Sequence, residues 1–377
     1  MFFPKFVDAN QNSSMMKRIL LMIAMLLYGS AMLVFAQDDN WIRVEASDLN
    51  LIGKAFDTPN PYHRVDTLKY DLVEKRIKEE ARDAAGLAVL FKTNATEIGV
   101  SIVFGPYKSR QSYRSYRGVD LYIKKDGKWL WAGMNDFYPN HKDSLAVKKV
   151  VWDMDNSLKE CMMYLPIEAE IYSLKVCVPK GSTIEPMASP FRHKIVFHGS
   201  SFTHGISTER AGMSYPMQFM RHTGLQVIPM GFSGRCKMQT YMADMMADVE
   251  ADAYVFDAFS NPSGKQIKQR LFPYIERMIA AHPGKPLIFQ RTIYWERGNF
   301  NLDMRKSNYE KWAASDSLMK IACKKYPNVY YIKTDASSGT EESFTADGVH
   351  PTGAGYSCWE RSIEKPILKI LKKYGIK

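Results

Sequence analysis

The chain has 377 residues, of which 46% are hydrophobic and 24% are charged, as in ordinary globular proteins. That length is enough for two domains. The formal net charge is +11, and it remains +9 without residues 1–36, which hold three basic residues and one aspartate. The basic residues are scattered and form no nucleic-acid-binding motif, so no nucleic-acid partner is predicted. A basic solvated surface is the simpler interpretation, and an anionic polymer substrate is the alternative.

The first 36 residues are predicted to be a signal peptide. The basic pair Lys17-Arg18 precedes an apolar run from Ile19 to Ala36, and the small residues near Ala36 suit cleavage. We therefore expect export to the periplasm or the extracellular space, with Met15 and Met16 as alternative translation starts. The competing interpretation is an uncleaved membrane anchor, because the run is close to the minimum length of a spanning helix. No later segment is apolar for long enough, so no membrane span is predicted in the mature chain.

The five cysteines are too few to form a disulfide framework. Each domain must therefore be stabilised mainly by its own hydrophobic core. A bridge between Cys161 and Cys177 is the one pairing to consider, because these residues fall in neighbouring predicted strands.

Residues 37–190 alternate between apolar and polar side chains in the manner of β-strands. Ile98, Val100, Ile102 and Phe104 fall on one face of a strand. Residues 119–131 are typical of a hairpin whose two-residue turn is Asp126-Gly127. One helix is expected, over residues 72–85. Many short strands with little helix predict a β-sandwich, of the jelly-roll kind, as the N-terminal domain.

From residue 191 to residue 377, strands alternate with helices. Strands are predicted at 194–198, 226–230, 253–257, 286–290 and 329–333, and helices at 214–223, 238–250, 266–281, 304–325 and 353–373. This alternation predicts an α/β domain in which a parallel sheet is covered on both faces. The chemistry of such folds lies beyond the carboxyl ends of the strands, so the loops that follow them form the candidate site.

Ser201 is the candidate nucleophile, because it follows the first of these strands in a loop with small neighbours that lets the backbone turn sharply. A serine hydroxyl needs a base to take its proton. His350 is the best base, since it lies in the loop before the last helix. Asp347, three residues earlier, can bind the other ring nitrogen and fix the tautomer.

Several alternatives to these assignments remain open. Asp347 could simply cap the last helix, and Asp335 could orient His350 in its place. His204 lies close to Ser201 but has no carboxylate at suitable spacing. The other histidines are expected to pack or to be solvated: His193, His198, His222 and His282. No His, Asp or Glu cluster has the spacing of metal ligands, so neither a metal nor another cofactor is predicted.

Four motifs resemble a known family. Gly199-Ser200-Ser201-Phe202, Gly234, Asn261 and Asp347-x-x-His350 appear in the order of the four blocks of the SGNH, or GDSL-type, hydrolases. The resemblance covers about residues 191–377 and implies a three-layer α/β/α, flavodoxin-like fold with a Ser-His-Asp mechanism. It also implies an oxyanion hole formed by Ser201, Gly234 and Asn261.

The same comparison extends upstream. Residues 118–122, Gly-Val-Asp-Leu-Tyr, are similar to the GxDLY signature of the β-sandwich domain that precedes some bacterial members. Two departures from the family pattern stand out. Ser200 replaces the aspartate that usually precedes the nucleophile, and the usual glycine and aspartate are missing around Asn261.

The loop after the fourth strand contains Arg291, Tyr294 and Trp295. These residues are expected either to form a stacking platform for a sugar ring or to pack against the sandwich domain. Together, the residues and the resemblance predict an exported serine esterase that hydrolyses short acyl esters, chiefly acetyl, on carbohydrates. The alternatives are a lysophospholipase or thioesterase for longer acyl chains, and a carbohydrate-binding protein without turnover.

Overall fold

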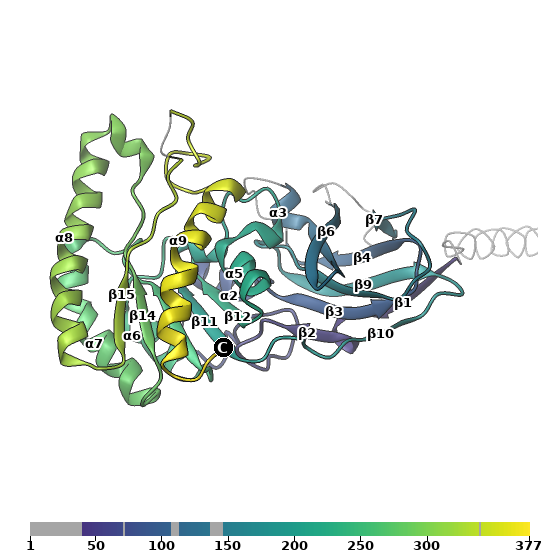
Figure 1. The fold of residues 1–377 in the computed structure, drawn as a ribbon, viewed down its shortest axis with the longest axis horizontal. Helices are drawn as coiled ribbons and strands as arrows, with labels where there is room; N and C mark the ends of the chain where they lie inside the picture. Colours follow the sequence, from purple (N-terminus) through teal and green to yellow (C-terminus); the bar gives the residue numbers. More distant parts are fainter. Residues whose placement is uncertain (1–39, 71, 107–112, 136–145, 339–340) are drawn as a thin grey trace, which may run out of the picture. The chain divides into compact units, whose positions relative to one another are not determined.

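The structure is a computed structural model that describes residues 40–377 except residues 71, 107–112, 136–145 and 339–340 (Figure 1). Residues Ile42–Lys377 form one compact unit. The predicted signal peptide lies outside the described residues. Among the helices in the described part, none is both long enough and apolar enough to cross a membrane.

Two antiparallel sheets make up the N-terminal part, as the sequence predicts. One has the strand order β1-β9-β4-β7, and the other has the order β10-β3-β8-β5-β6 with β2 paired to β3. The strands are β1 (Trp41–Glu45), β2 (Asn50–Ile52), β3 (Ala88–Thr93), β4 (Ile98–Phe104), β5 (Val119–Lys125), β6 (Lys128–Asn135), β7 (Lys148–Val151), β8 (Lys159–Tyr164), β9 (Ile171–Pro179) and β10 (Ile184–Pro186). The helical segments are η1 (Ala46–Asp48), α2 (Lys75–Ala81) and α3 (Tyr113–Arg117).

The core of this sandwich lies between its two sheets. Ile98, Val100 and Ile102 of β4 are fully buried in one cluster with residues of β3 from the other sheet, and Phe104, on the same predicted face, packs partly buried against this cluster. The β5–β6 hairpin turns at Asp126 and Gly127, whose φ angles are 51° and 76°. Positive φ at both positions is what a two-residue type I′ turn requires.

The C-terminal part contains a five-stranded parallel sheet. Its strands are β11 (Lys194–Gly199), β12 (Gln226–Gly231), β13 (Ala253–Asp257), β14 (Leu287–Gln290) and β15 (Val329–Ile332). They are arranged in the order β12-β11-β13-β14-β15. Counted along the chain this is the flavodoxin-like order 2-1-3-4-5, whose crevice opens beside the first strand, between it and the third.

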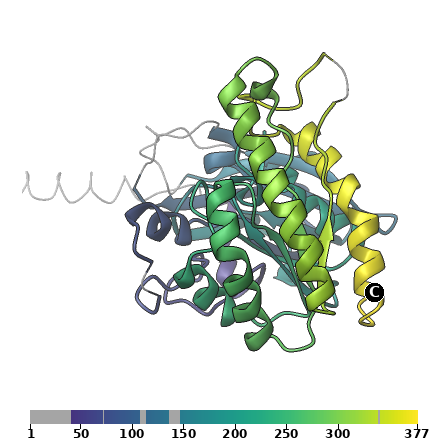
Figure 2. The same ribbon diagram turned by 90° about the vertical axis from the view of Figure 1, so that its left-hand side faces the viewer.

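Helices cover both faces of the parallel sheet, which gives the predicted α/β/α layers. The helical segments are α4 (Ser201–His204), η2 (Ala211–Met213), α5 (Tyr215–Thr223), α6 (Thr240–Ala247), α7 (Gly264–Ala281), η3 (Glu296–Asn299), α8 (Leu302–Lys325) and α9 (Gly353–Lys372). Phe197 of β11 packs with α5 and α9, whereas its neighbour Val196 packs with α6, α7 and α8. Figure 1 views the sheet nearly edge-on between α8 and α9, and Figure 2 shows α8, in light green, facing the viewer.

The helix ends differ from the prediction for reasons of capping. Helix α7 begins two residues early because Ser263 and Gln266 form a reciprocal capping box. Helix α8 begins early because the side chain of Asn301 accepts a hydrogen bond from the Met304 N–H. The short helices α3 and α4 are not among the elements predicted from the sequence.

Cys161 and Cys177 are both free and buried, so the bridge considered between them is absent. Cys161 lies on β8 of one sheet, and Cys177 lies on β9 of the other. Their strands are consecutive in the chain but are not paired.

The GxDLY residues lie where the six-stranded sheet packs on the α/β part. Asp120 is fully buried and accepts hydrogen bonds from Arg210 Nη1 at 3.0 Å and from the Gly212 N–H at 2.9 Å. The Arg221 guanidinium lies 4.1 Å from the centroid of the Tyr122 ring. The signature therefore fixes the segment between α4 and α5. The domain boundary that we place at residues 190/191 falls between β10 and β11 and remains a prediction.

Candidate active site

Ser201 is the first residue of α4 and directly follows the loop residue Ser200, whose side chain caps this helix by accepting a hydrogen bond from the Phe202 N–H. Gly199 ends β11 at a point of close approach, since a Cβ atom there would lie 2.6 Å from the Cβ of Asp257. The sharp strand-to-helix turn therefore depends on a glycine, as the sequence pattern indicates.

Ser201, His350 and Asp347 form a continuous hydrogen-bonded chain. His350 Nε2 lies 3.0 Å from Ser201 Oγ, and His350 Nδ1 lies 2.9 Å from Asp347 Oδ2. A carboxylate accepts only from a protonated Nδ1, which leaves Nε2 of the neutral ring free to accept the serine proton. The structure thus brings together the three residues that the sequence analysis selected.

The carboxylate of Asp347 is held in position by hydrogen bonds to Oδ1, the oxygen that does not contact the imidazole. Oδ1 accepts hydrogen bonds from the N–H groups of Val349 at 2.9 Å and His350 at 2.7 Å. Partial burial raises the pKa of Asp347, but the hydrogen bonds from His350 and Val349 outweigh it and leave the pKa below its ordinary value. Asp347 therefore stays ionised opposite the imidazole. Asp335 instead accepts a hydrogen bond from the Ser337 N–H.

The imidazole is also held by packing and by a neighbouring loop. The Phe202 ring meets the His350 ring edge-on, with centroids 5.5 Å apart, and itself packs on Trp359. The N–H of Arg297 donates to the Gly348 carbonyl at 2.8 Å, and the Arg297 side chain donates to the Asp347 carbonyl. These contacts fix the loop that carries both Asp347 and His350.

A cavity of about 800 Å³ opens at Ser201. It is lined by Arg76, Glu168, Ser201, Phe202, Ile206, Ser233, Gly234, Arg235, Lys237, Ser260, Asn261, Trp295, Lys311, Val349 and His350. Gly234 has a φ of 69°, which glycine adopts without strain. Asn261 Oδ1 accepts a hydrogen bond from the Cys236 N–H at 3.2 Å, so the amide NH₂ is the group left to donate into the cavity. All three residues assigned to the oxyanion hole thus line one cavity.

The three residues expected to bind a sugar ring are divided between two places. Trp295 lines the cavity at Ser201, whereas Arg291 and Tyr294 line a separate depression of about 350 Å³ with Trp312. The Arg291 guanidinium lies 4.4 Å from the centroid of the Trp312 ring. Arg291 and Tyr294 therefore do not line the cavity at Ser201, and both pack toward α8.

Asp257, at the end of β13, is a site residue that the sequence analysis missed. It is fully buried, and its Oδ2 accepts hydrogen bonds from Ser200 Oγ at 2.5 Å and from the Ser200 N–H at 3.1 Å. Burial raises the pKa of Asp257 to about 6, although the hydrogen bonds from Ser200 and Ser260 oppose the shift. Asp257 thereby brings a carboxylate to Ser200, where the family pattern would have its own aspartate. The sequence does contain a signal for this role, because Asp257 is the one polar residue at the end of an otherwise apolar strand.

Residues of α2 and α8 also build the site. Glu80 of α2 is buried and accepts a hydrogen bond from the Ser233 N–H at 2.7 Å, next to Gly234. Lys311 of α8 donates to the Ser260 carbonyl at 2.5 Å and lies 4.1 Å from the centroid of the Trp295 ring. Burial lowers the pKa of Lys311 to about 8, although Asp257 opposes the shift. No local sequence motif marks Glu80 or Lys311, because each supports the site by a hydrogen bond to a loop that is distant in the sequence.

The other histidines close to Ser201 are structural. His198 is buried, its Nδ1 is 2.8 Å from the Met230 carbonyl oxygen, and burial lowers its pKa to about 4. His204 lies within hydrogen-bond distance of Ser233 Oγ and of the Ile167 carbonyl. His282 was expected to be solvated at an element end, but it is buried beside Tyr254.

Comparisons with known proteins identify the family. Residues 192–368 match the model of the GDSL-like lipase/acylhydrolase family, and residues 40–184 match that of the N-terminus of SGNH-hydrolase-type esterases. A solved structure of a Bacteroides ovatus protein described as a GDSL-like lipase is 36% identical, with a TM-score of 0.82, and the match covers 88% of this chain and 98% of that one. The chain belongs to the GDSL-like lipase/acylhydrolase family. This SGNH hydrolase is therefore an ester-hydrolysing enzyme.

More distant structures share the fold of this SGNH hydrolase. The salicylyl-acyltransferase SsfX3 from a tetracycline biosynthetic pathway is 18% identical, with a TM-score of 0.67 and coverage of 89% of this chain and 99% of that one. A family two carbohydrate esterase from Clostridium thermocellum, in complex with cellohexaose, is 14% identical, with a TM-score of 0.56 and coverage of 76% and 93%. No curated protein matches the sequence significantly.

Proposed function

We propose that this SGNH hydrolase is an exported serine esterase that removes short acyl groups, chiefly acetyl, from carbohydrates. The observation that carries the proposal is the chain of hydrogen bonds from Asp347 through His350 to Ser201. A binding protein without turnover has no need of a nucleophile aligned with a base and an orienting carboxylate.

In the proposed mechanism, Ser201 Oγ attacks the ester carbonyl carbon while His350 Nε2 takes the hydroxyl proton. The resulting oxyanion accepts hydrogen bonds from the N–H groups of Ser201 and Gly234 and from the NH₂ group of Asn261; one such donor typically contributes about 3 kcal/mol. The carbon–oxygen bond to the sugar then breaks, and His350 returns its proton to the departing oxygen. Water attacks the acyl-enzyme with the same histidine as base, which releases the acid and restores Ser201.

The lining of the cavity supports a small acyl group on a polar carrier. Charged side chains stand at several points of the wall: Arg76, Glu168, Arg235, Lys237 and Lys311. A long alkyl chain would have to displace water from these groups without offering them hydrogen bonds. Trp295 instead presents an aromatic surface suited to a sugar ring. One of the proteins that share the fold is a carbohydrate esterase in complex with cellohexaose, which agrees with this class of substrate.

We expect the kcat/KM for p-nitrophenyl esters to fall from acetyl to butyryl to octanoyl. A pocket bounded by charged and aromatic side chains would exclude the longer chains, whereas an apolar acyl channel would gain about 0.8 kcal/mol per methylene, roughly fourfold in kcat/KM. Initial rates across the series measure this. A rise with chain length would replace the carbohydrate esterase proposal by a lysophospholipase or thioesterase.

Trp295 and Tyr294 provide a matched pair of variants for the same question. Trp295→Ala is expected to lower the kcat/KM for acetylated oligosaccharides by about five- to thirtyfold, on the order of one stacking contact of 1–2 kcal/mol, while that for p-nitrophenyl acetate changes less. Tyr294→Ala serves as the control, because its ring lies in the other depression. Equal losses in the two variants would argue against stacking at Trp295.

Export is the remaining part of the proposal, and the apolar run at residues 19–36 supports it. We expect the protein recovered from the periplasm or the culture medium to begin near Gln37. Mass spectrometry of its N-terminal peptide checks this, and a chain that retained residues 1–36 in the membrane fraction would favour the anchor.

A further inference from the structure

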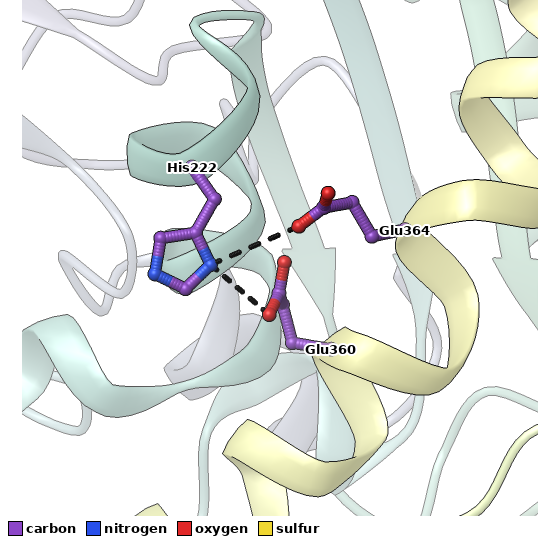
Figure 3. A group of neighbouring side chains, drawn as sticks. All are labelled: His222, Glu360 and Glu364. Carbon is purple, nitrogen blue, oxygen red and sulfur yellow. Dashed lines mark ion pairs between the residues drawn. The ribbon is translucent and has the colours of Figure 1, made fainter.

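Three side chains that commonly bind metals meet between α5 and α9, outside the residues that line the catalytic cavity. His222 belongs to the last turn of α5, and Glu360 and Glu364 lie one turn apart on α9 (Figure 3). His222 Nδ1 is 3.0 Å from Glu360 Oε2 and 4.0 Å from Glu364 Oε2. One ligand atom from each residue can be chosen so that all three lie within 4.8 Å of one another.

Glu360 is the unusual member of this group. Its side chain is fully buried, and neither of its oxygens accepts a hydrogen bond from any donor outside the group in the described part of the chain. Buried carboxylates normally accept several, as Asp120 and Asp257 do in this protein. A buried carboxylate without such donors is costly unless a positive charge compensates for it.

The second carboxylate increases the need for compensation. Glu364 Oε2 lies 4.0 Å from the same imidazole nitrogen that Glu360 Oε2 approaches to 3.0 Å, so both carboxylates converge on one point. In Figure 3 the carboxylates of Glu360 and Glu364 and the imidazole of His222 all point toward one another. Two adjacent carboxylates and one imidazole nitrogen offer the charge and the donor atoms that suit a divalent ion.

We propose that His222, Glu360 and Glu364 bind one divalent transition-metal ion of the Zn²⁺ type and that this ion ties α5 to α9. Zn²⁺ binds imidazole nitrogen and carboxylate oxygen at about 2.0–2.2 Å, so two ligand atoms of a tetrahedral site lie roughly 3.3 Å apart. The observed separations of 3.0 and 4.0 Å require only small side-chain movements to reach this value. The imidazole favours Zn²⁺ over Mg²⁺, which prefers oxygen ligands alone.

From the sequence, His222 is expected to be solvated, and no set of residues has the spacing of metal ligands. The two glutamates have the i, i+4 spacing of one helix face, but the histidine comes from a distant helix, so only the fold assembles the three. The proposed ion would act on structure and not on turnover. It links two helices that already pack together through the stacked rings of Tyr215 and Trp359, which are 4.7 Å apart.

The test is a calorimetric titration of the metal-stripped full-length mature protein with ZnCl₂, together with thermal unfolding. We expect one Zn²⁺ per chain and a rise in Tm of about 2–5 °C at a hundredfold excess over Kd. Glu364→Gln and His222→Ala should each weaken the affinity at least tenfold and, at the same Zn²⁺ concentration, reduce the rise in Tm to about half or less. Both residues are partly exposed, so both variants should fold.

His193→Ala is the matched control, because His193 also pairs with a carboxylate at the surface, that of Asp252, but no further metal-binding side chain joins this pair among the described residues. Its Zn²⁺ affinity should equal that of the parent chain. Unchanged Zn²⁺ binding in Glu364→Gln and His222→Ala would overturn the proposal, as would the absence of stoichiometric binding in the parent. Competition by millimolar Mg²⁺ would also contradict it, because that result would indicate a site of oxygen ligands.

Discussion

Replacement of Ser201 by alanine should lower the kcat for p-nitrophenyl acetate by about 10⁴–10⁶-fold, with the Tm almost unchanged. The large loss follows from the removal of the nucleophile, which no other described hydroxyl can replace opposite His350 Nε2. The Tm should not move because the change deletes one small group that contacts the cavity. Steady-state kinetics and thermal unfolding measure the two effects. Stoichiometric labelling of Ser201→Ala by a fluorophosphonate probe would place the nucleophile elsewhere.

A double variant tests whether Ser201 and His350 act as one unit. The residues of a triad are strongly non-additive, since the base has no function once the nucleophile is gone. Ser201→Ala/His350→Ala should therefore be about as active as either single variant. Losses that multiply would show that His350 contributes in another way. His193→Ala is again a suitable control, because this partly exposed histidine lies outside the site residues.

Asp120→Ala should destabilise the protein by about 3–5 kcal/mol. The substitution removes the buried carboxylate that pairs with Arg210 and accepts the Gly212 N–H, and it leaves both donors without that partner. Asp120→Asn should be destabilised less, because it keeps the shape and one acceptor. Urea unfolding of the two variants measures the difference.

Asp244→Ala is the comparison for Asp120→Ala. Asp244 pairs with Arg277 at 2.9 Å, but both side chains are about half exposed, so the pair should contribute less than about 1 kcal/mol. If Asp120→Ala lost no more stability than Asp244→Ala, the GxDLY aspartate would not be the link between the sheet and the α/β part that the structure indicates.

The fold was largely predictable because its signals are local. The strands at 194–198 and 253–257 are short, continuous apolar runs, and helices α7 and α9 repeat their apolar residues along one face. The helix ends that moved did so through side-chain caps at Ser263 and Asn301. Asp347 and His350 were also recognisable, because a carboxylate three residues before a histidine can reach its ring within one turn of chain.

The remaining parts of the site depend on contacts between distant segments. Asp257 supports Ser200 from a neighbouring strand, and Glu80 supports Ser233 from the other half of the chain. The ring of Tyr294 packs toward Tyr309 and Trp312 of α8, and this packing depends on the path of the loop and not on its composition. Proximity of this kind leaves no periodic pattern in the sequence.

The packing of the six-stranded sheet on the α/β part has a practical consequence for fragments and chimeras. Leu90 and Tyr164 of that sheet share one buried cluster with Phe197 and Tyr215. A recombinant fragment beginning at residue 191 would expose this apolar surface to water and would be prone to aggregate. It would also lack Arg76 and Glu168 from the wall of the cavity. A chimera that exchanges substrate specificity between relatives should therefore take the N-terminal β-sandwich part and the C-terminal α/β part from the same protein.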